Sequence, residues 1–216
     1  GINTRYVANK NQCASDLAYT AAENLIDKLG WDKQTIKGLI LITQSPDYRK
    51  PSTACVLQYR LKLSEECIAF DVNLGCSAFV YGIFLGSLML SNNDINRMLI
   101  LIGDAGSRYF SSDDHSSLLL HGEAGSAIAL EYDSKLDYDI KYSLKTDGSG
   151  FKSIYTPAGA SRNFYTAKRE PYLHEDGIMR SDYDHFMNGL EIFQFSITKV
   201  PKTIKEFMNH FKLNNS

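Results

Sequence analysis

Four short apolar runs limit the folds open to this chain more than any other feature of its sequence. They span residues 39–42, 68–72, 98–102 and 126–130. Within each run the apolar residues follow one another almost without interruption, whereas a strand with one face in water alternates apolar and polar residues. We therefore predict that all four runs are central strands of a sheet, covered on both faces.

Segments with helical spacing separate these runs. Apolar residues between Leu17 and Leu29 recur at steps of three or four and stop at Gly30, a residue type that often ends a helix. Further helices are predicted over residues 52–62 and 77–90. Alternating strands and helices predict an α/β fold with a largely parallel sheet.

Three segments need a separate reading. The helix over 77–90 is apolar around most of its circumference, so we expect it to be buried on all sides. Residues 131–180 are polar, rich in aromatic residues and interrupted by turn signals, which predicts a strand followed by surface loops. A last helix, over 186–211, is expected to be interrupted or kinked at Pro201, which cannot donate an intrahelical hydrogen bond.

Length and composition exclude several classes of protein. A chain of 216 residues with 44% hydrophobic side chains can fill a sizeable core. Its net charge of -2, from 23 basic and 25 acidic residues, gives no field that would gather nucleic acid or an anionic membrane. No apolar stretch approaches the roughly 20 residues of a membrane-spanning helix, and the first residues lack a secretory-signal layout. We therefore expect a cytoplasmic protein.

Among the cysteines, Cys76 has the neighbourhood of a reactive thiol. It follows an apolar run and a short turn, and it precedes the apolar helix, where unpaired backbone N–H groups and the helix dipole favour a thiolate. A structural cysteine at a helix start would give the same spacing, so this pattern alone leaves both roles open. Cys13, Cys55 and Cys67 show no metal-site or disulfide spacing and are expected to be reduced, small buried apolar residues.

The segment around Cys76 resembles a known family. DVNLGCSAFVYG, residues 71–82, is similar to the D-x-N-x-x-C-S-G-F-x-Y-G segment around the nucleophile of the β-ketoacyl-acyl-carrier-protein synthase III enzymes. Further stretches resemble that family in the same order along nearly the whole chain. They are GINTRYVA at residue 1, PSTACVLQYRL at 51, HGEAGSAIAL at 121, TDGSG at 146 and MNGLEIFQFSI at 187.

This resemblance implies a thiolase-like fold, a layered α-β-α arrangement with a mixed, largely parallel sheet and a buried central helix after Cys76. Residues 1–150 would form the amino-terminal half without its first strand. Residues 151–185 would be connecting loops, and 186–216 the truncated first long helix of the carboxy-terminal half. The fold is therefore expected to be incomplete.

The resemblance also implies a reaction. Cys76 would take the acyl group of an acyl-coenzyme A primer, and malonyl-acyl carrier protein would lose carbon dioxide and attack the resulting thioester. The family's histidine and asparagine for the second step lie beyond residue 216, so residues 1–216 alone are not expected to condense. No permanently bound cofactor and no metal are implied. Acyl carrier protein is the expected partner, and a homodimer the expected assembly.

Two histidines are candidate substrate-binding residues. His115 stands where many family members carry an arginine that stacks on the adenine of coenzyme A, and His121 where they usually carry a phenylalanine beside the acyl site. A packing role for His121 stays open. The neighbouring Asp113 and Asp114 could suggest a metal, but paired acids in a serine-rich loop are expected to be solvated turn residues.

Two alternative functions remain. One is a cysteine hydrolase in which Cys76 stands on a nucleophile elbow, His121 or His115 is the base, and Asp104 orients it. The sequence around Cys76 lacks the second glycine of the G-x-S-x-G elbow, which counts against it. The other is a non-catalytic thiolase-fold dimer partner, against which the intact cysteine motif argues.

Overall fold

The computed structural model describes residues 2–91, 94–136 and 140–213. The chain divides into two compact units. Unit 1 comprises Gly1–Ser107 and Gly122–Tyr138, and unit 2 comprises Arg108–His121 and Asp139–Ser216. The domain boundaries expected at residues 150 and 185 refer to the longer family fold and stay a prediction.

Unit 1 is built on a four-stranded sheet in the order β2-β1-β3-β4. The strands are β1 (Gly38–Ile42), β2 (Ile68–Val72), β3 (Arg97–Asp104) and β4 (Ala124–Glu131). Strand β1 pairs in parallel with both β2 and β3, whereas β4 runs antiparallel to β3. The prediction of four strands in a mixed, largely parallel sheet is confirmed.

The prediction that all four strands are central is wrong for two of them. Every residue of β1 is buried. Strands β2 and β4 lie at the two edges of the described sheet, each with one neighbouring strand, and none of their residues is fully buried. An apolar run shows that a strand is covered, but its place in the sheet depends on pairing with distant segments.

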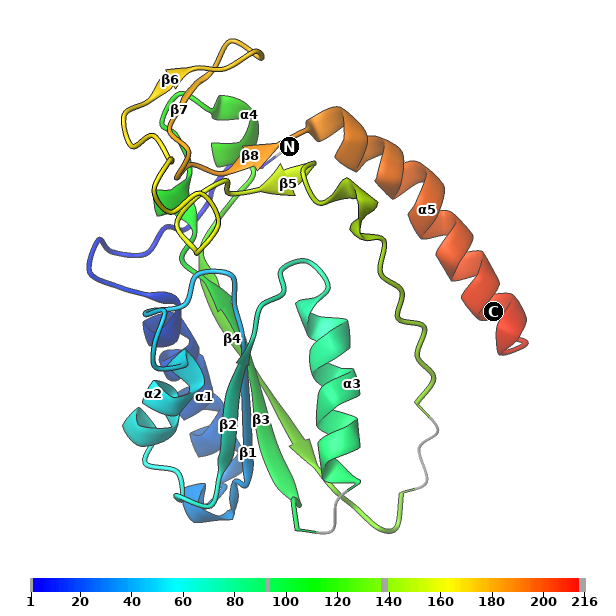
Figure 1. Cartoon of the computed structure of the whole chain (residues 1–216). Helices are drawn as coiled ribbons and strands as arrows, with labels where there is room; N and C mark the ends of the chain where they lie inside the picture. Colours follow the sequence, from blue (N-terminus) through cyan, green and yellow to red (C-terminus); the bar gives the residue numbers. More distant parts are fainter. Residues whose placement is uncertain (1, 92–93, 137–139, 214–216) are drawn as a thin grey trace. The chain divides into compact units, whose positions relative to one another are not determined.

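Helices cover both faces of this sheet (Figure 1). Helices α1 (Ala14–Leu29) and α2 (Thr53–Arg60) lie on one face and α3 (Ala78–Leu90) on the other, with a short 3-10 turn, η1 (Lys33–Thr35), after α1. Because side chains alternate along a strand, Leu39 and Leu41 join the core under α1 and α2, while Ile40 and Ile42 join the core under α3. The expected layered α-β-α arrangement is confirmed.

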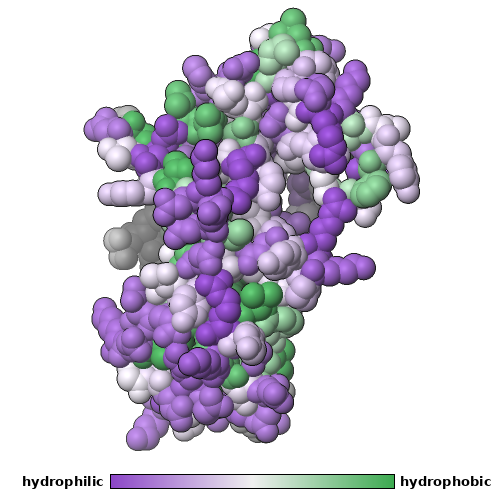
Figure 2. All heavy atoms as spheres, turned by 90° about the vertical axis from the view of Figure 1, so that its left-hand side faces the viewer, coloured by the Kyte–Doolittle hydropathy of each residue, from purple (hydrophilic) through white to green (hydrophobic). Residues whose placement is uncertain are grey.

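The ends and outer surface of the first helix agree with the sequence pattern. Gly30 adopts φ 63°, the left-handed conformation, and closes α1 as predicted. The outer side of α1 and α2, in the lower part of Figure 2, carries mostly hydrophilic side chains. These helices therefore bury one stripe and leave the other in water.

Helix α3 differs from the expectation that it is buried on all sides. Its buried residues are Ala78, Gly82 and Gly86, while Phe79 is 59% and Leu88 55% exposed. A Cβ added to Gly86 would lie 2.6 Å from Leu130 Cδ1, so the small residues let the helix approach the sheet closely. The described residues therefore cover one narrow face of α3 and leave its large apolar side chains partly in solvent.

Unit 2 consists of short elements and one long helix. Strand β5 (Ile154–Tyr155) pairs with β8 (Phe186–Met187), and β6 (Tyr172–Leu173) pairs with β7 (Met179–Arg180). The other elements are α4 (His115–Leu118), the 3-10 turn η3 (Gly148–Gly150) and α5 (Gly189–His210). A 3-10 turn, η2 (Ser107–Tyr109), stands where the chain passes from unit 1 to unit 2.

The last helix is shorter than expected at both ends, and it contains its proline. It begins at Gly189, after Asn188 accepts a hydrogen bond from the Glu191 backbone N–H, and it continues through Pro201. An interruption at Pro201 is therefore wrong, the alternative of a kink there stays a prediction, and residues 186–187 belong to β8 instead. Proline removes one N–H donor, a local loss that the remaining turns of a long helix tolerate. Among the described residues, no helix is long and apolar enough to cross a membrane.

Candidate active site

Cys76 lies on the turn between β2 and α3, two residues before the helix begins. Leu74 donates its N–H to Val72 O at 3.2 Å, and Ala78 donates to Gly75 O at 2.8 Å, so both ends of the turn are hydrogen-bonded. Ser77 is the N-cap residue of α3, and its side chain makes no capping hydrogen bond. The Cys76 side chain is exposed. The structure therefore presents this thiol to solvent at the amino end of a helix.

The acidic residue of the motif, Asp71, has a structural role that the sequence analysis missed. Its two carboxylate oxygens accept the backbone N–H groups of Thr53 at 2.7 Å and Ala54 at 2.6 Å. Asp71 on β2 thereby caps the first turn of α2, whose own N-cap residue, Ser52, makes no such bond. An acidic residue inside an otherwise apolar run was the available signal.

Asp104, the last residue of β3, holds the residues that follow β1, at the end of the sheet from which the Cys76 turn leaves β2. Its Oδ1 accepts from Thr43 Oγ1 at 2.8 Å and from the Gln44 and Ser45 backbone N–H groups at 2.8 and 3.0 Å. Ser45 Oγ donates to it as well, at 2.8 Å. These contacts occupy Asp104 in holding residues 43–45, which counts against its role as the histidine-orienting acid of a hydrolase.

The other cysteines have surroundings that differ from that of Cys76. Cys67 is buried, and burial raises the pKa of its thiol to about 11, which makes it unreactive near neutral pH. Cys55 is exposed on α2, and Cys13 is half-buried at the start of α1. The expectation of burial is therefore confirmed for Cys67 alone of these three and is wrong for Cys55. All four cysteines are free thiols, as expected.

The candidate residues His115 and His121 belong to unit 2, whereas Cys76 belongs to unit 1. His115 is exposed at the start of α4. His121 is half-buried, and its Nδ1 lies 2.8 Å from Ser117 O, so this nitrogen carries the proton. Its ring lies 4.5 Å from that of Phe110. Their roles toward a substrate stay predictions.

His185 is a neighbour of His121 that the sequence analysis did not single out. The two ring centroids are 6.1 Å apart, and the Phe110 ring lies 4.8 Å from that of His185. Burial, followed by the proximity of His121, lowers the pKa of His185 below its usual 6.5. Unit 2 therefore holds a histidine pair packed around one phenylalanine.

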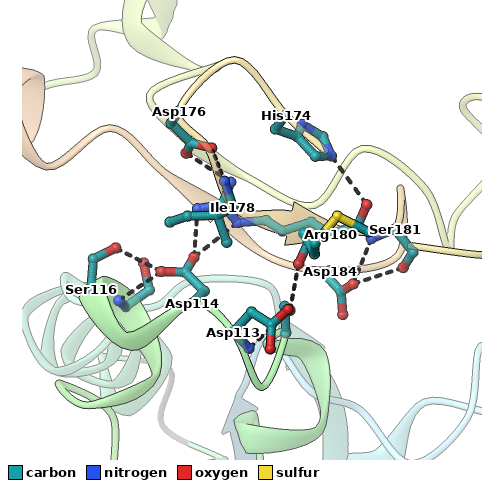
Figure 3. Close-up of polar contacts among 12 residues, drawn as sticks. Asp113, Asp114, Ser116, His174, Asp176, Ile178, Arg180, Ser181 and Asp184 are labelled. Carbon is teal, nitrogen blue, oxygen red and sulfur yellow. Dashed lines mark hydrogen bonds and ion pairs between the residues drawn. The ribbon is translucent and has the colours of Figure 1, made fainter. Parts of the chain in front are cut away.

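A buried ion pair lies beside these histidines in the same unit. Figure 3 shows the Arg180 side chain between Asp114 and Asp176. Arg180 donates from Nε to Asp114 Oδ2 at 2.9 Å and from Nη1 to Asp176 Oδ2 at 2.8 Å. The expectation that Asp114 is a solvated turn residue is wrong, because the residue is fully buried. Asp113 is exposed, as expected.

No metal centre emerges from these groups. Within residues 2–91, 94–136 and 140–213, no three His, Cys, Asp or Glu side chains are arranged to hold a metal ion. The carboxylate oxygens of Asp114 that could ligate a metal already accept hydrogen bonds from Arg180 and from Ser116 and Ser117.

Comparison with known proteins matches the segment that carries Cys76. The sequence profile of the family described as 3-oxoacyl-[acyl-carrier-protein (ACP)] synthase III matches residues 70–148. A Campylobacter jejuni protein named as a 3-oxoacyl-[acyl-carrier-protein] synthase 3 is 31% identical over 99% of this chain and 60% of its own length. A Caldanaerobacter subterraneus β-ketoacyl-[acyl-carrier-protein] synthase III is 31% identical over 91% of this chain and 57% of its own.

The solved structures agree in fold. A crystal structure of a 3-oxoacyl-(acyl-carrier-protein) synthase III superposes with a TM-score of 0.89 at 30% identity, over 96% of this chain and 62% of that one. Over nearly its whole length, this chain is therefore similar to the 3-oxoacyl-[acyl-carrier-protein] synthase III proteins. The Burkholderia xenovorans synthase gives a TM-score of 0.83 at 32% identity, over 97% of this chain and 58% of that one. The thiolase-like fold expected of a synthase III is confirmed.

This chain spans about three fifths of the length of these relatives, 60% and 57% for the two curated proteins. The profile match at residues 70–148 contains Cys76, His115 and His121. Roles for these three residues are taken up as proposals below.

Proposed function

We propose that this protein is a condensing acyltransferase in which Cys76 accepts an acyl group from an acyl-coenzyme A primer and free coenzyme A leaves. Malonyl-acyl carrier protein then loses carbon dioxide, and the carbanion attacks the Cys76 thioester to give a β-ketoacyl chain and the free thiol. Acyl-coenzyme A and malonyl-acyl carrier protein are substrates, and no bound cofactor is required.

One observation carries the proposal. Cys76 is an exposed thiol on the β2–α3 turn, inside the segment that matches the synthase III profile. The first N–H groups of a helix have no intrahelical acceptor, so the start of α3 offers donors for the oxyanion that forms when a thiol attacks a thioester. Chemistry at this position needs an open approach, and the exposure of Cys76 supplies it.

The remaining parts of the proposal rest on the similarity to the synthase III relatives. Acyl carrier protein is the partner that delivers the malonyl group, and the cytoplasm is the compartment. A homodimer is the assembly. His115 and His121 are proposed to contact the substrate, with His115 toward coenzyme A and His121 toward the acyl group.

Acyl loading is tested by intact-mass spectrometry after incubation with acetyl-coenzyme A. An adduct of one acyl group, mapped by peptide mass to Cys76 and absent in Cys76→Ala, is the expected result. Cys55→Ala is the matched control, since it removes another exposed thiol and should load like the wild type. An adduct that survives in Cys76→Ala, or no adduct at all, contradicts the proposal.

The lifetime of the adduct separates the alternatives. A condensing enzyme keeps the thioester until malonyl-acyl carrier protein arrives, whereas a hydrolase releases free acid within the dead time of the experiment. The hydrolase reading would then replace the proposed one. A chain that never loads under any condition fits the non-catalytic dimer partner.

A further inference from the structure

Gln44 lies directly against the residue that precedes Cys76. A Cβ atom added to Gly75 would lie 2.3 Å from Gln44 Oε1 and 3.0 Å from Gln44 Cδ. The carboxamide of Gln44 therefore fills the space that a side chain at position 75 would need. Gly75 is not among the glycines with a left-handed φ, so its backbone conformation does not by itself require glycine.

The backbone of Gln44 is held firmly in that place. Its N–H donates to Asp104 Oδ1 at 2.8 Å, and the neighbouring Thr43 donates its N–H to Val72 O, the last residue of β2, at 3.1 Å. Ser45 Oγ also accepts the Ala105 N–H at 2.9 Å. The ends of β1, β2 and β3 are thus tied together at the point from which the Gln44 side chain reaches the turn.

The Gln44 side chain takes no part in this hydrogen-bonded frame. Within the described part of the chain its carboxamide makes no hydrogen bond, and the residue is exposed. Its contact with Gly75 is therefore one of packing and satisfies no polar group of the fold. The Gln44 side chain can therefore restrict the turn that carries Cys76 without stabilising the rest of unit 1.

We propose that Gln44 is a positioning residue for Cys76: its carboxamide packs against Gly75 and holds the turn in the conformation that presents the thiol. The inference rests on the proposed function only in taking Cys76 as the acyl acceptor. Misplacing a nucleophile by a fraction of its reaction distance lowers the rate of attack while leaving substrate binding unchanged.

Three variants test this contact: Gln44→Ala, Gly75→Ala and the double variant. In Gly75→Ala the added methyl group meets the far end of a flexible side chain, so Gln44 swings away and the fold survives. Each single variant should lower the maximal rate of Cys76 acylation by acetyl-coenzyme A about tenfold, with an unchanged half-saturation concentration. The double variant should lose no more than either single one, because both remove the same contact.

Amide hydrogen exchange of residues 74–78 gives a readout that does not depend on activity. The three variants should raise exchange there and leave α1 and the urea midpoint unchanged. Gln44→Met, which keeps the length of the side chain without its amide, should restore both loading and protection because the contact is one of packing.

The outcomes separate this inference from the proposed function. One outcome is that neither the wild type nor any variant loads an acyl group, while amide hydrogen exchange of residues 74–78 rises in the variants. The proposed function then fails, and the positioning contact stands. If the wild type loads and Gln44→Ala loads within twofold of it, Gln44 does not position Cys76. Additive losses in the double variant would assign the effect to the methyl group at position 75 and also overturn the inference.

Discussion

Arg180 Nη2 lies 2.8 Å from Asp114 Oδ2, and the two side chains are 2% and 0% exposed. The partners are 66 positions apart in the sequence. Asp114 also caps the short helix α4, with its Oδ1 accepting from the Ser117 N–H at 3.1 Å. The Asp114 carboxylate thus makes a hydrogen bond within the 108–121 segment, to Ser117, and an ion pair that links this segment to Arg180 on strand β7 within unit 2.

Removing one partner of this pair should destabilise the protein. Arg180→Met leaves the buried Asp114 carboxylate without its counter-charge, and such a loss costs about 3–5 kcal/mol of unfolding free energy. Asp114→Asn should cost less, because Arg180 keeps its ion pair with Asp176. Urea unfolding at pH 7 measures both losses. The control is the exposed pair of Lys145 and Glu206, where Lys145→Met should leave the unfolding curve unchanged. Equal losses in both pairs would contradict the role given to burial.

Acid should weaken unit 2 through Asp114. Burial by itself raises the pKa of this carboxyl, but hydrogen bonds from Ser116 and Arg180 and the charge of Arg180 outweigh it, and the pKa lies below its usual 3.8. A carboxyl with a lowered folded pKa stabilises the fold above its unfolded pKa, and this contribution is lost as the pH falls through the folded value. Unfolding free energies measured below about pH 4 should therefore drop, and Asp114→Asn should flatten that part of the curve.

His185 should make the unfolding free energy depend on pH in a higher range than Asp114 does. Burial lowers its folded pKa below 6.5, so the unfolded chain binds the proton first and stability falls as the pH drops below that value. Its Nε2 is buried and has no partner among the described residues. His185→Phe removes the protonation site and the unsatisfied nitrogen, and should flatten the dependence of unfolding free energy between about pH 7 and 5. A slope equal to that of the wild type would show that His185 does not titrate in this range.

The contrast between Asp113 and Asp114 shows where sequence reasoning reaches its limit. Both are acids in the same serine-rich loop, and nothing local distinguishes them. Of the two, Asp114 alone is buried, because the fold brings Arg180, which is distant in the sequence, into contact with it. Asp71 is a different case, because its place inside an apolar run already indicates that this acid has a specific partner.

The fold was easier to predict than the surroundings of the site. Apolar continuity marked all four strands, and Gly30 marked the end of α1, because both are properties of a few neighbouring residues. The exposure of α3 was missed because hydropathy records which residues can be buried, whereas burial depends on what covers them. Cys76 was predicted from its position between a strand and a helix, but the packing of Gln44 on Gly75 involves a residue from another strand end.

Gly125 should tolerate no side chain. A Cβ there would lie 2.3 Å from the Leu17 backbone carbonyl carbon and 2.5 Å from the Ala18 backbone nitrogen, so α1 packs on β4 through bare backbone. Gly125→Ala must displace the helix, a kind of overpacking that costs about 1–3 kcal/mol. Gly106→Ala is the matched control, since nothing lies within 4 Å of its Cβ position. Thermal unfolding of both variants compares them directly, and equal midpoints would contradict the close approach.

Asp71 rather than Ser52 should govern the start of α2. Ser52 stands at the N-cap position, yet its side chain makes no capping bond, while Asp71 accepts both the Thr53 and Ala54 N–H groups. Asp71→Ala should therefore cost about 1–2 kcal/mol and speed hydrogen exchange at residues 53 and 54. Ser52→Ala should change neither quantity. The reverse ranking would mean that α2 is capped from its own sequence, and that the motif acid next to the Cys76 turn is free for another role.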